Sequence, residues 1–159
     1  MESHSLLIAI LVLFSSLIVL ISYLSTLQRA LRKCAPASRA MQPWEVWLML
    51  IPIFGLVWHF VIVMYMTESL GNEFRRIGIP CPEPTFGRYI GFANCLCSLC
   101  LVFLPYVGRL LAWPIPPILL GRFLGAFASL VLFIAYWNRI ANYSRILDTN
   151  QAVAPVPLS

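Results

Sequence analysis

The residues best suited to chemistry lie inside apolar stretches, and the first of them is His59, which is surrounded by aromatic and aliphatic side chains. A proton relay through this imidazole would need further acids at the same depth, and only Glu45 is near. A haem or other cofactor would need a second ligand, which the sequence does not show. We therefore interpret His59 as a hydrogen-bonded or interfacial histidine and as only a weak cofactor candidate.

Three cysteines follow in one apolar run, as Cys95, Cys97 and Cys100. Only the last two share a helix face, at i and i+3, and no second pair of Cys or His lies nearby to complete a tetrahedral metal site. The sequence also has no glycine-rich phosphate loop, no HExxH motif and no nucleophile in a recognisable context. We expect no metal, no cofactor and no enzymatic activity.

The composition indicates which elements hold these residues. Of 159 residues, 60% are hydrophobic and 11% are charged, whereas soluble proteins average roughly 45–50% and about 25%. The 11 basic residues outnumber the 6 acids, but they cluster beside apolar runs, which favours lipid headgroups over nucleic acid as their partner. The odd number of cysteines argues against a disulfide framework.

Four apolar runs are each close to the length of about 20 residues that a membrane-spanning helix needs. They predict an all-α integral membrane protein built as a small bundle, with one domain over residues 1–147 and a flexible tail over residues 148–159. The four runs cover residues 6–24, 44–66, 89–105 and 118–137.

The first run has no Lys or Arg before it and four basic residues directly after it, which places the amino terminus outside and the following loop in the cytoplasm. The absence of a basic start argues against a signal peptide. These four residues are Arg29, Arg32, Lys33 and Arg39.

The second run carries Trp44, Trp47 and Trp58, which suit a membrane interface, and is interrupted by Pro52 and Gly55. Its length favours a span that is kinked at Pro52. Charge favours a re-entrant hairpin, because spanning divides the basic residues six to five between the two sides, whereas a hairpin divides them nine to two. A hairpin, however, frees backbone groups that lipid cannot satisfy. Both topologies stay open.

The fourth run contains Gly121, Gly125 and Ser129 at successive i, i+4 positions. Small residues at this spacing let a second helix approach closely, within the bundle or between subunits. Arg122 is the one basic residue in a predicted span and is best interpreted as reaching the headgroups. Asn94 in the third run is a candidate for an interhelical hydrogen bond.

The segment 41–54, with the sequence MQPWEVWLMLIPIF, resembles a motif of small bacterial polytopic integral membrane proteins of unassigned function. Residues 57–58 (VW) and 69–74 (SLGNEF) continue the resemblance, which covers about residues 20–147. It implies a bacterial origin and a location in the cytoplasmic membrane, and it implies no chemistry.

These patterns favour an interaction component of the membrane, either a homo-oligomer or an accessory subunit of a larger complex. Its partners would be the lipid bilayer and other membrane subunits or copies of itself. The alternative is an oligomeric channel or transporter component in which the break between Pro52 and Gly55 lines a path.

Overall fold

A computed structural model describes residues 2–80, 83, 85–110 and 115–153. Within these residues the chain is all-helical and contains no strand. The elements in chain order are α1 (Glu2–Lys33), η1 (Pro36–Ser38), η2 (Glu45–Leu50), α2 (Phe54–Ile77), α3 (Arg88–Leu110) and α4 (Ile115–Val153).

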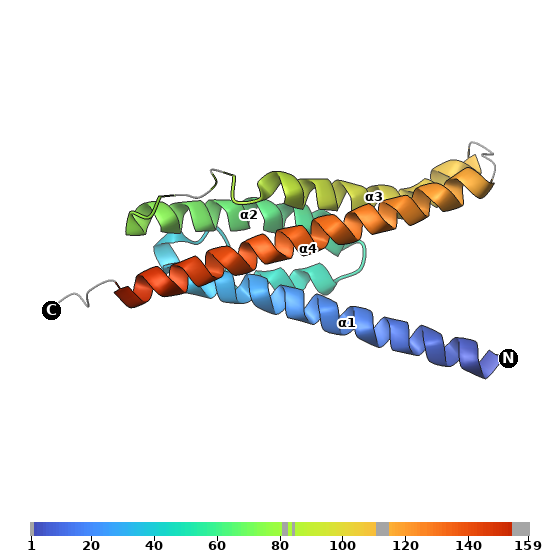
Figure 1. Ribbon diagram of the computed structural model, residues 1–159, viewed down its shortest axis with the longest axis horizontal. Coiled ribbons are helices and arrows are strands. Elements are labelled where there is room, and N and C mark those ends of the chain that lie inside the picture. Colours follow the sequence, from blue (N-terminus) through green and yellow to red (C-terminus); the bar gives the residue numbers. More distant parts are fainter. Residues whose placement is uncertain (1, 81–82, 84, 111–114, 154–159) are drawn as a thin grey trace.

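The four α-helices lie roughly along one long axis, and each has a segment long and apolar enough to cross a membrane. The carboxyl ends of α1, α2 and α4 lie together, and we call this the basic end (Figure 1). The amino end of α1, the carboxyl end of α3 and the amino end of α4 lie at the opposite end. The four predicted apolar segments therefore all lie in helical elements, although the second is broken.

The second segment forms two helical legs that run antiparallel. The Trp58 indole nitrogen donates to the carbonyl oxygen of Glu45, 13 residues earlier, and closer to the turn Gly55 lies against Met49, 6 residues earlier (55 − 49). The sequence separation shrinks toward the turn, as it does in a hairpin. The chain therefore enters and leaves this segment at the basic end, and the alternative of one kinked helix is not what forms.

A tight turn over Ile51–Gly55 makes this reversal. The N–H of Phe54 donates to the Pro52 carbonyl at 2.7 Å and the N–H of Gly55 donates to the Ile51 carbonyl at 2.7 Å. Ile53, at φ 65° and ψ −55°, is the centre of a γ-turn of the strained positive-φ type. Because the turn bonds much of its own backbone, the main objection to a hairpin at membrane depth is weakened.

The hairpin also decides where the charges lie. Of the 11 basic residues, only Arg109 and Arg122 lie toward the opposite end. The other nine (11 − 2) lie in the half of the molecule that includes the basic end, which we call the basic half. This is the nine-to-two division that the hairpin topology predicts from the sequence.

The core lies in the basic half, where the hairpin packs between α1, α3 and α4. Each helix contributes the side chains of one face to this core. In α1 the buried side chains lie in the carboxyl half, from Tyr23 onward, and most side chains of the amino half are exposed. The largest fully buried side chains are Tyr23, Leu24, Leu27, Leu31, Ile62, Met66, Leu70, Glu73, Phe74, Tyr136, Ile140 and Leu147.

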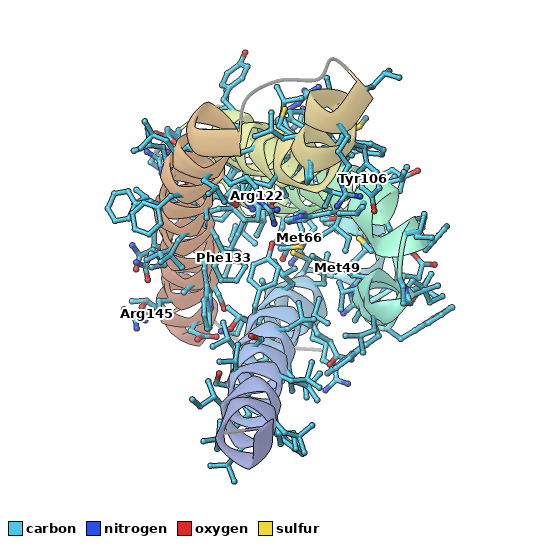
Figure 2. The ribbon with its side chains drawn as sticks, turned by 90° about the vertical axis from the view of Figure 1, so that its right-hand side faces the viewer. Met49, Met66, Tyr106, Arg122, Phe133 and Arg145 are labelled. Carbon is cyan, nitrogen blue, oxygen red and sulfur yellow. The ribbon has the colours of Figure 1, made fainter. Side chains whose placement is uncertain are left out.

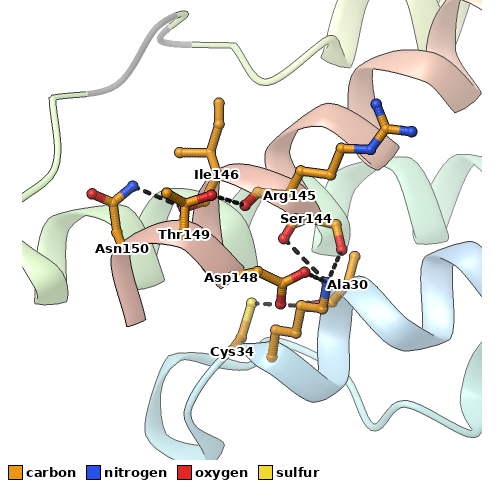
Figure 3. A network of polar contacts seen from close by, with 9 residues as sticks. Ala30, Cys34, Ser144, Arg145, Ile146, Asp148, Thr149 and Asn150 are labelled. Atoms are coloured by element: carbon orange, nitrogen blue, oxygen red, sulfur yellow. Dashed lines mark hydrogen bonds and ion pairs between the residues drawn. The ribbon is translucent and has the colours of Figure 1, made fainter. Parts of the chain in front are cut away.

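Polar contacts fix α1 to the end of α4 (Figure 3). The Lys33 ammonium donates to the Ser144 hydroxyl at 2.7 Å and pairs with Asp148 at 2.6 Å. Helix α4 therefore continues to Val153, six residues into the stretch for which the sequence predicts a flexible tail. The last six residues of that predicted tail, 154–159, lie outside the described part of the chain.

The loop after α1 is held by the buried end of α2. The Glu73 carboxylate accepts from the N–H of Ala35 at 3.0 Å and pairs with Arg76 at 2.6 Å, while the Ser69 hydroxyl accepts from the N–H of Ala40 at 2.9 Å. Helix α2 then ends where Gly78 takes the left-handed conformation, shortly before Pro80. These contacts join the loop after α1 to α2 at the basic end.

Candidate functional site

A cavity of about 620 Å³ lies where the amino half of α1 diverges from α3 and α4, beside the tip of the hairpin. Figure 2 looks along the bundle from the opposite end and shows α1 apart from the other helices, with Phe133 on the α4 side and Met49 on the η2 side of the space between. The wall consists of Leu20, Met49, Ile51, Pro52, Ile53, Gly55, Leu56, His59, Asn94, Cys95, Ser98, Leu101, Ala126, Ser129, Leu130 and Phe133.

Three of these wall residues form a polar chain between α3 and α4. The Ser129 hydroxyl donates to the side-chain oxygen of Asn94 at 3.2 Å, and the hydroxyls of Ser98 and Ser129 are 3.2 Å apart. Asn94 is only 3% exposed. The sequence interpretation of Asn94 as an interhelical hydrogen-bonding residue agrees with this geometry.

His59 reaches the same cavity from the hairpin and is 6% exposed. Its Nε2 lies 3.1 Å from the Tyr23 hydroxyl of α1. Tyr23 is completely buried, and its ring packs on Phe133 with centroids 4.8 Å apart. The histidine is therefore hydrogen-bonded between helices.

The hairpin tip forms the remaining wall, and its residues Ile51, Pro52 and Gly55 line the cavity. Ile53, the strained residue of the turn, also lines it and is 84% exposed. Strained backbone of this kind persists only where its surroundings hold it, and it concentrates at functional sites.

The described wall contains no Lys, Arg, Asp or Glu. In the described part of the chain no group of three or more His, Cys, Asp or Glu is placed to hold a metal ion. A mostly apolar cavity with a few convergent polar groups is the usual form of a small-molecule site. The geometry suits an uncharged molecule that is apolar along most of its length and polar at one point.

The small-residue stripe of α4 faces α3 of the same chain. A Cβ atom on Gly125 would lie 2.9 Å from Leu101 Cδ2, and one on Gly121 would lie 3.7 Å from Leu104 Cδ2. Ser129, the third member, bonds to α3 through Asn94. The structure therefore uses this stripe inside the bundle.

The three cysteines of α3 separate by environment. Cys95 is buried and lines the cavity, whereas Cys97 donates through its thiol to the carbonyl of Gly125 at 3.3 Å and Cys100 is exposed. They do not converge on one point with His59.

Arg122 lies at the opposite end beside Arg109, where both line a second cavity of about 380 Å³ with Tyr106. Both arginines are exposed.

The remaining predicted topology residues lie in the carboxyl half of α1, in the loop after it and in the hairpin. Arg29 and Arg32 are exposed, and Arg39 donates to the carbonyls of Cys34 and Arg32 and so closes the loop after α1. Among the tryptophans, Trp44 is exposed, Trp47 packs against the core and Trp58 stacks on Phe54.

The sequence interpretation missed Tyr23 and Ser98. Tyr23 is one of many aromatic residues in apolar runs, and only the fold brings it to His59, 36 residues away. Ser98 had a signal, since it follows Asn94 at i+4 and so shares its helix face. The phenol of Tyr136 is a further buried polar group, and it has no hydrogen-bond partner among the described residues.

Comparison of the chain with protein-family models, with curated proteins and with solved structures found no match. The function is therefore inferred from the geometry of the bundle and its cavity.

Proposed function

We propose that the protein is a multi-pass component of a bacterial cytoplasmic membrane with a structural, interaction-based role. It associates through α1 with a second copy of itself or with subunits of a larger membrane complex. The observation that carries this proposal is the exposed face of α1, which combines largely exposed apolar side chains in its amino half, Leu13 by 69%, with the small residues Ser15 and Ser22. Within this half, Leu20 packs against the core and lines the cavity, whereas most of the other described apolar side chains are exposed.

Orientation follows from the charges. Nine of the 11 basic residues lie in the basic half, and membrane proteins keep such residues on the cytoplasmic side. The amino terminus then lies outside, while both ends of the hairpin and the end of α4 lie inside.

Exposed apolar surface alone does not require a partner, because lipid tails are as apolar as leucine. Small residues that let helices approach are more informative. Ser15 and Ser22, one heptad apart on the exposed face of α1, donate their hydroxyls to the carbonyls of Val12 and Ile18 of the same helix. They therefore present small surfaces whose hydroxyl protons are already bonded.

We call the surface around Ser15 and Ser22 the serine face, and it is the place where we expect association. The stripe of α4 already packs against α3 through Gly125 and Leu101, so part of it is used within the chain. The face of α1 that carries Ser15 and Ser22 is an exposed small-residue surface in the described structure.

The test is the oligomeric state after mild detergent extraction, measured by native mass spectrometry. The wild type is expected as an oligomer or with co-purifying subunits, and the double substitution Ser15→Leu with Ser22→Leu is expected to release the monomer. A control with Leu13→Phe and Leu17→Phe adds bulk on the far side of the helix and should leave the assembly intact. A strictly monomeric wild type without partners would refute the proposal.

A channel or transporter component is the second candidate, because the predicted break at Pro52 and Gly55 lines a cavity together with Asn94 and Ser98. Broken helices that line cavities are common in transport proteins. Reconstituted vesicles that show no ion or solute flux under any imposed gradient would remove this candidate.

A further inference from the structure

We propose that the cavity beside the hairpin tip binds an uncharged membrane amphiphile, a single apolar chain that carries a carbonyl group. The carbonyl belongs either to an acyl ester or to an isoprenoid quinone, and it accepts hydrogen bonds from Asn94 and His59. This site is independent of the proposed association through α1.

The polar chain on the wall leaves one donor group available. Ser129 gives its hydroxyl proton to the Asn94 oxygen, so Ser98 is the donor in the contact between the two serines. Both hydroxyl protons are then used within the protein. The Asn94 amide nitrogen carries two protons, and among the described residues it has no hydrogen-bond partner.

The second donor comes from His59. Tyr23 is completely buried and its hydroxyl contacts Nε2 of His59 at 3.1 Å. A phenol donates its proton readily, so we assign Nε2 as the acceptor, and the neutral ring then carries its proton on Nδ1. The wall thus offers N–H groups from two elements, α2 and α3, and a ligand that accepts hydrogen bonds matches them.

The other residues of the wall favour a ligand whose main part is apolar and uncharged. It is aliphatic and aromatic, with Leu20, Leu101 and Phe133 from three different helices. Transfer of a charged headgroup into such surroundings is costly unless an opposite charge is present, and the described wall has none. The volume of about 620 Å³ is within the usual range for ligand cavities of about 300–1,000 Å³.

The test uses the full-length protein in phosphatidylcholine vesicles with three photoreactive probes. One is a diazirine-bearing monoacylglycerol, the second is an azido isoprenoid quinone, and the third is a diazirine alkane that has no carbonyl. Labelling of the protein by either carbonyl probe, with the label mapped to wall residues of α3 and α4, supports the site, and the probe that labels identifies the source of the carbonyl.

Two substitutions on α4 separate the cavity from the general lipid surface. Ala126 lines the cavity and Ala128, two residues later, does not, and both are exposed. Ala126→Phe is expected to reduce labelling by the carbonyl probe to the level of the alkane, while Ala128→Phe leaves it unchanged. Neither substitution touches the polar chain, so both variants should fold.

Removal of the donor tests the recognition of the carbonyl. Asn94→Leu is expected to reduce carbonyl-probe labelling roughly fivefold, which corresponds to the loss of one hydrogen bond, without changing alkane labelling. The proposal is overturned if neither carbonyl probe labels the wall, if the alkane labels it equally well, or if Ala126→Phe and Ala128→Phe label alike.

Discussion

Two completely buried tyrosines differ in one hydrogen bond. The Tyr23 hydroxyl contacts His59 Nε2 at 3.1 Å, whereas the Tyr136 hydroxyl has no partner among the described residues. A buried polar group without a partner lowers stability, and a bonded one raises it modestly. The pair therefore provides a matched test of what hydrogen bonding adds to this core.

We expect Tyr23→Phe to lower the free energy of unfolding by about 0.5–1.5 kcal/mol, because it leaves His59 without its partner. Tyr136→Phe should leave stability unchanged or raise it. Thermal unfolding in detergent, followed by tryptophan fluorescence, measures both. Equal losses in the two variants would contradict the assignment of the hydrogen bonds.

Glu83 gives the basic end a dependence on pH. Its carboxylate accepts hydrogen bonds from Arg139 and Tyr143, and the bond from Arg139 is the main reason that the pKa of Glu83 lies below its ordinary value. A depressed pKa means that the folded state favours the ionised form, so the contribution is present above about pH 4.5 and is lost as the pH falls through the folded value.

The expected result is that wild type loses thermal stability between about pH 5 and pH 3 more steeply than Glu83→Gln does. The substitution keeps the shape of the side chain and removes its titration. Unfolding temperatures of the two proteins across this range give the comparison. Parallel curves would show that the contact with Arg139 does not contribute.

At the scale of elements, the hairpin depends on one close approach. A Cβ atom on Gly55 would lie 2.2 Å from the Met49 carbonyl oxygen, a backbone atom that cannot move without displacing η2. A Cβ on Gly121 meets only Leu104 Cδ2, at 3.7 Å. Gly55 is therefore required by the close packing of the hairpin, whereas the position of Gly121 has room for a methyl group.

Gly55→Ala is expected to destabilise the protein by about 1–3 kcal/mol or more, because it forces the two legs of the hairpin apart. Gly121→Ala should be neutral or stabilising by up to about 1 kcal/mol, since alanine favours a helix interior. Unfolding temperatures and the fluorescence of Trp58, which bonds across the hairpin, are the measurements. If Gly55→Ala did not lower the unfolding temperature, the two legs of the hairpin would not be in contact.

At the scale of the whole molecule, the second apolar segment reverses direction between η2 and α2, so it does not run straight from one end of the bundle to the other. The carboxyl ends of α1, α2 and α4 then share one side, and the end of α3 lies on the other. Topology mapping can separate this arrangement from four complete crossings, in which the end of α2 and the end of α4 lie outside.

In a cysteine-free background, single cysteines at Arg75, Arg145 and Leu110 test this with a membrane-impermeant maleimide on intact cells. We expect labelling at position 110 alone, because the proposed topology puts positions 75 and 145 on the cytoplasmic side. Permeabilised cells should label at all three positions, which controls for access. Labelling of position 75 in intact cells would show that the second segment crosses the membrane.

The sequence by itself predicted the helical class and the approximate location of the apolar segments, because 20-residue apolar runs have no other stable form in a bilayer. It also singled out Asn94 and the stripe of Gly121, Gly125 and Ser129, since a helix has a fixed period and such residues must share a face. It placed Pro52 and Gly55 at a break, but length and charge gave opposite predictions of what the break does.

Only the tertiary structure decided that the break is a reversal and that the stripe of α4 packs against α3 rather than another chain. The reversal depends on contacts between residues distant along the chain, such as Trp58 with Glu45, whose energies no local pattern contains. The same holds for the cavity, because its lining residues Leu20, His59 and Asn94 come from three helices. A periodic pattern fixes which face a residue lies on, and packing alone fixes what that face meets.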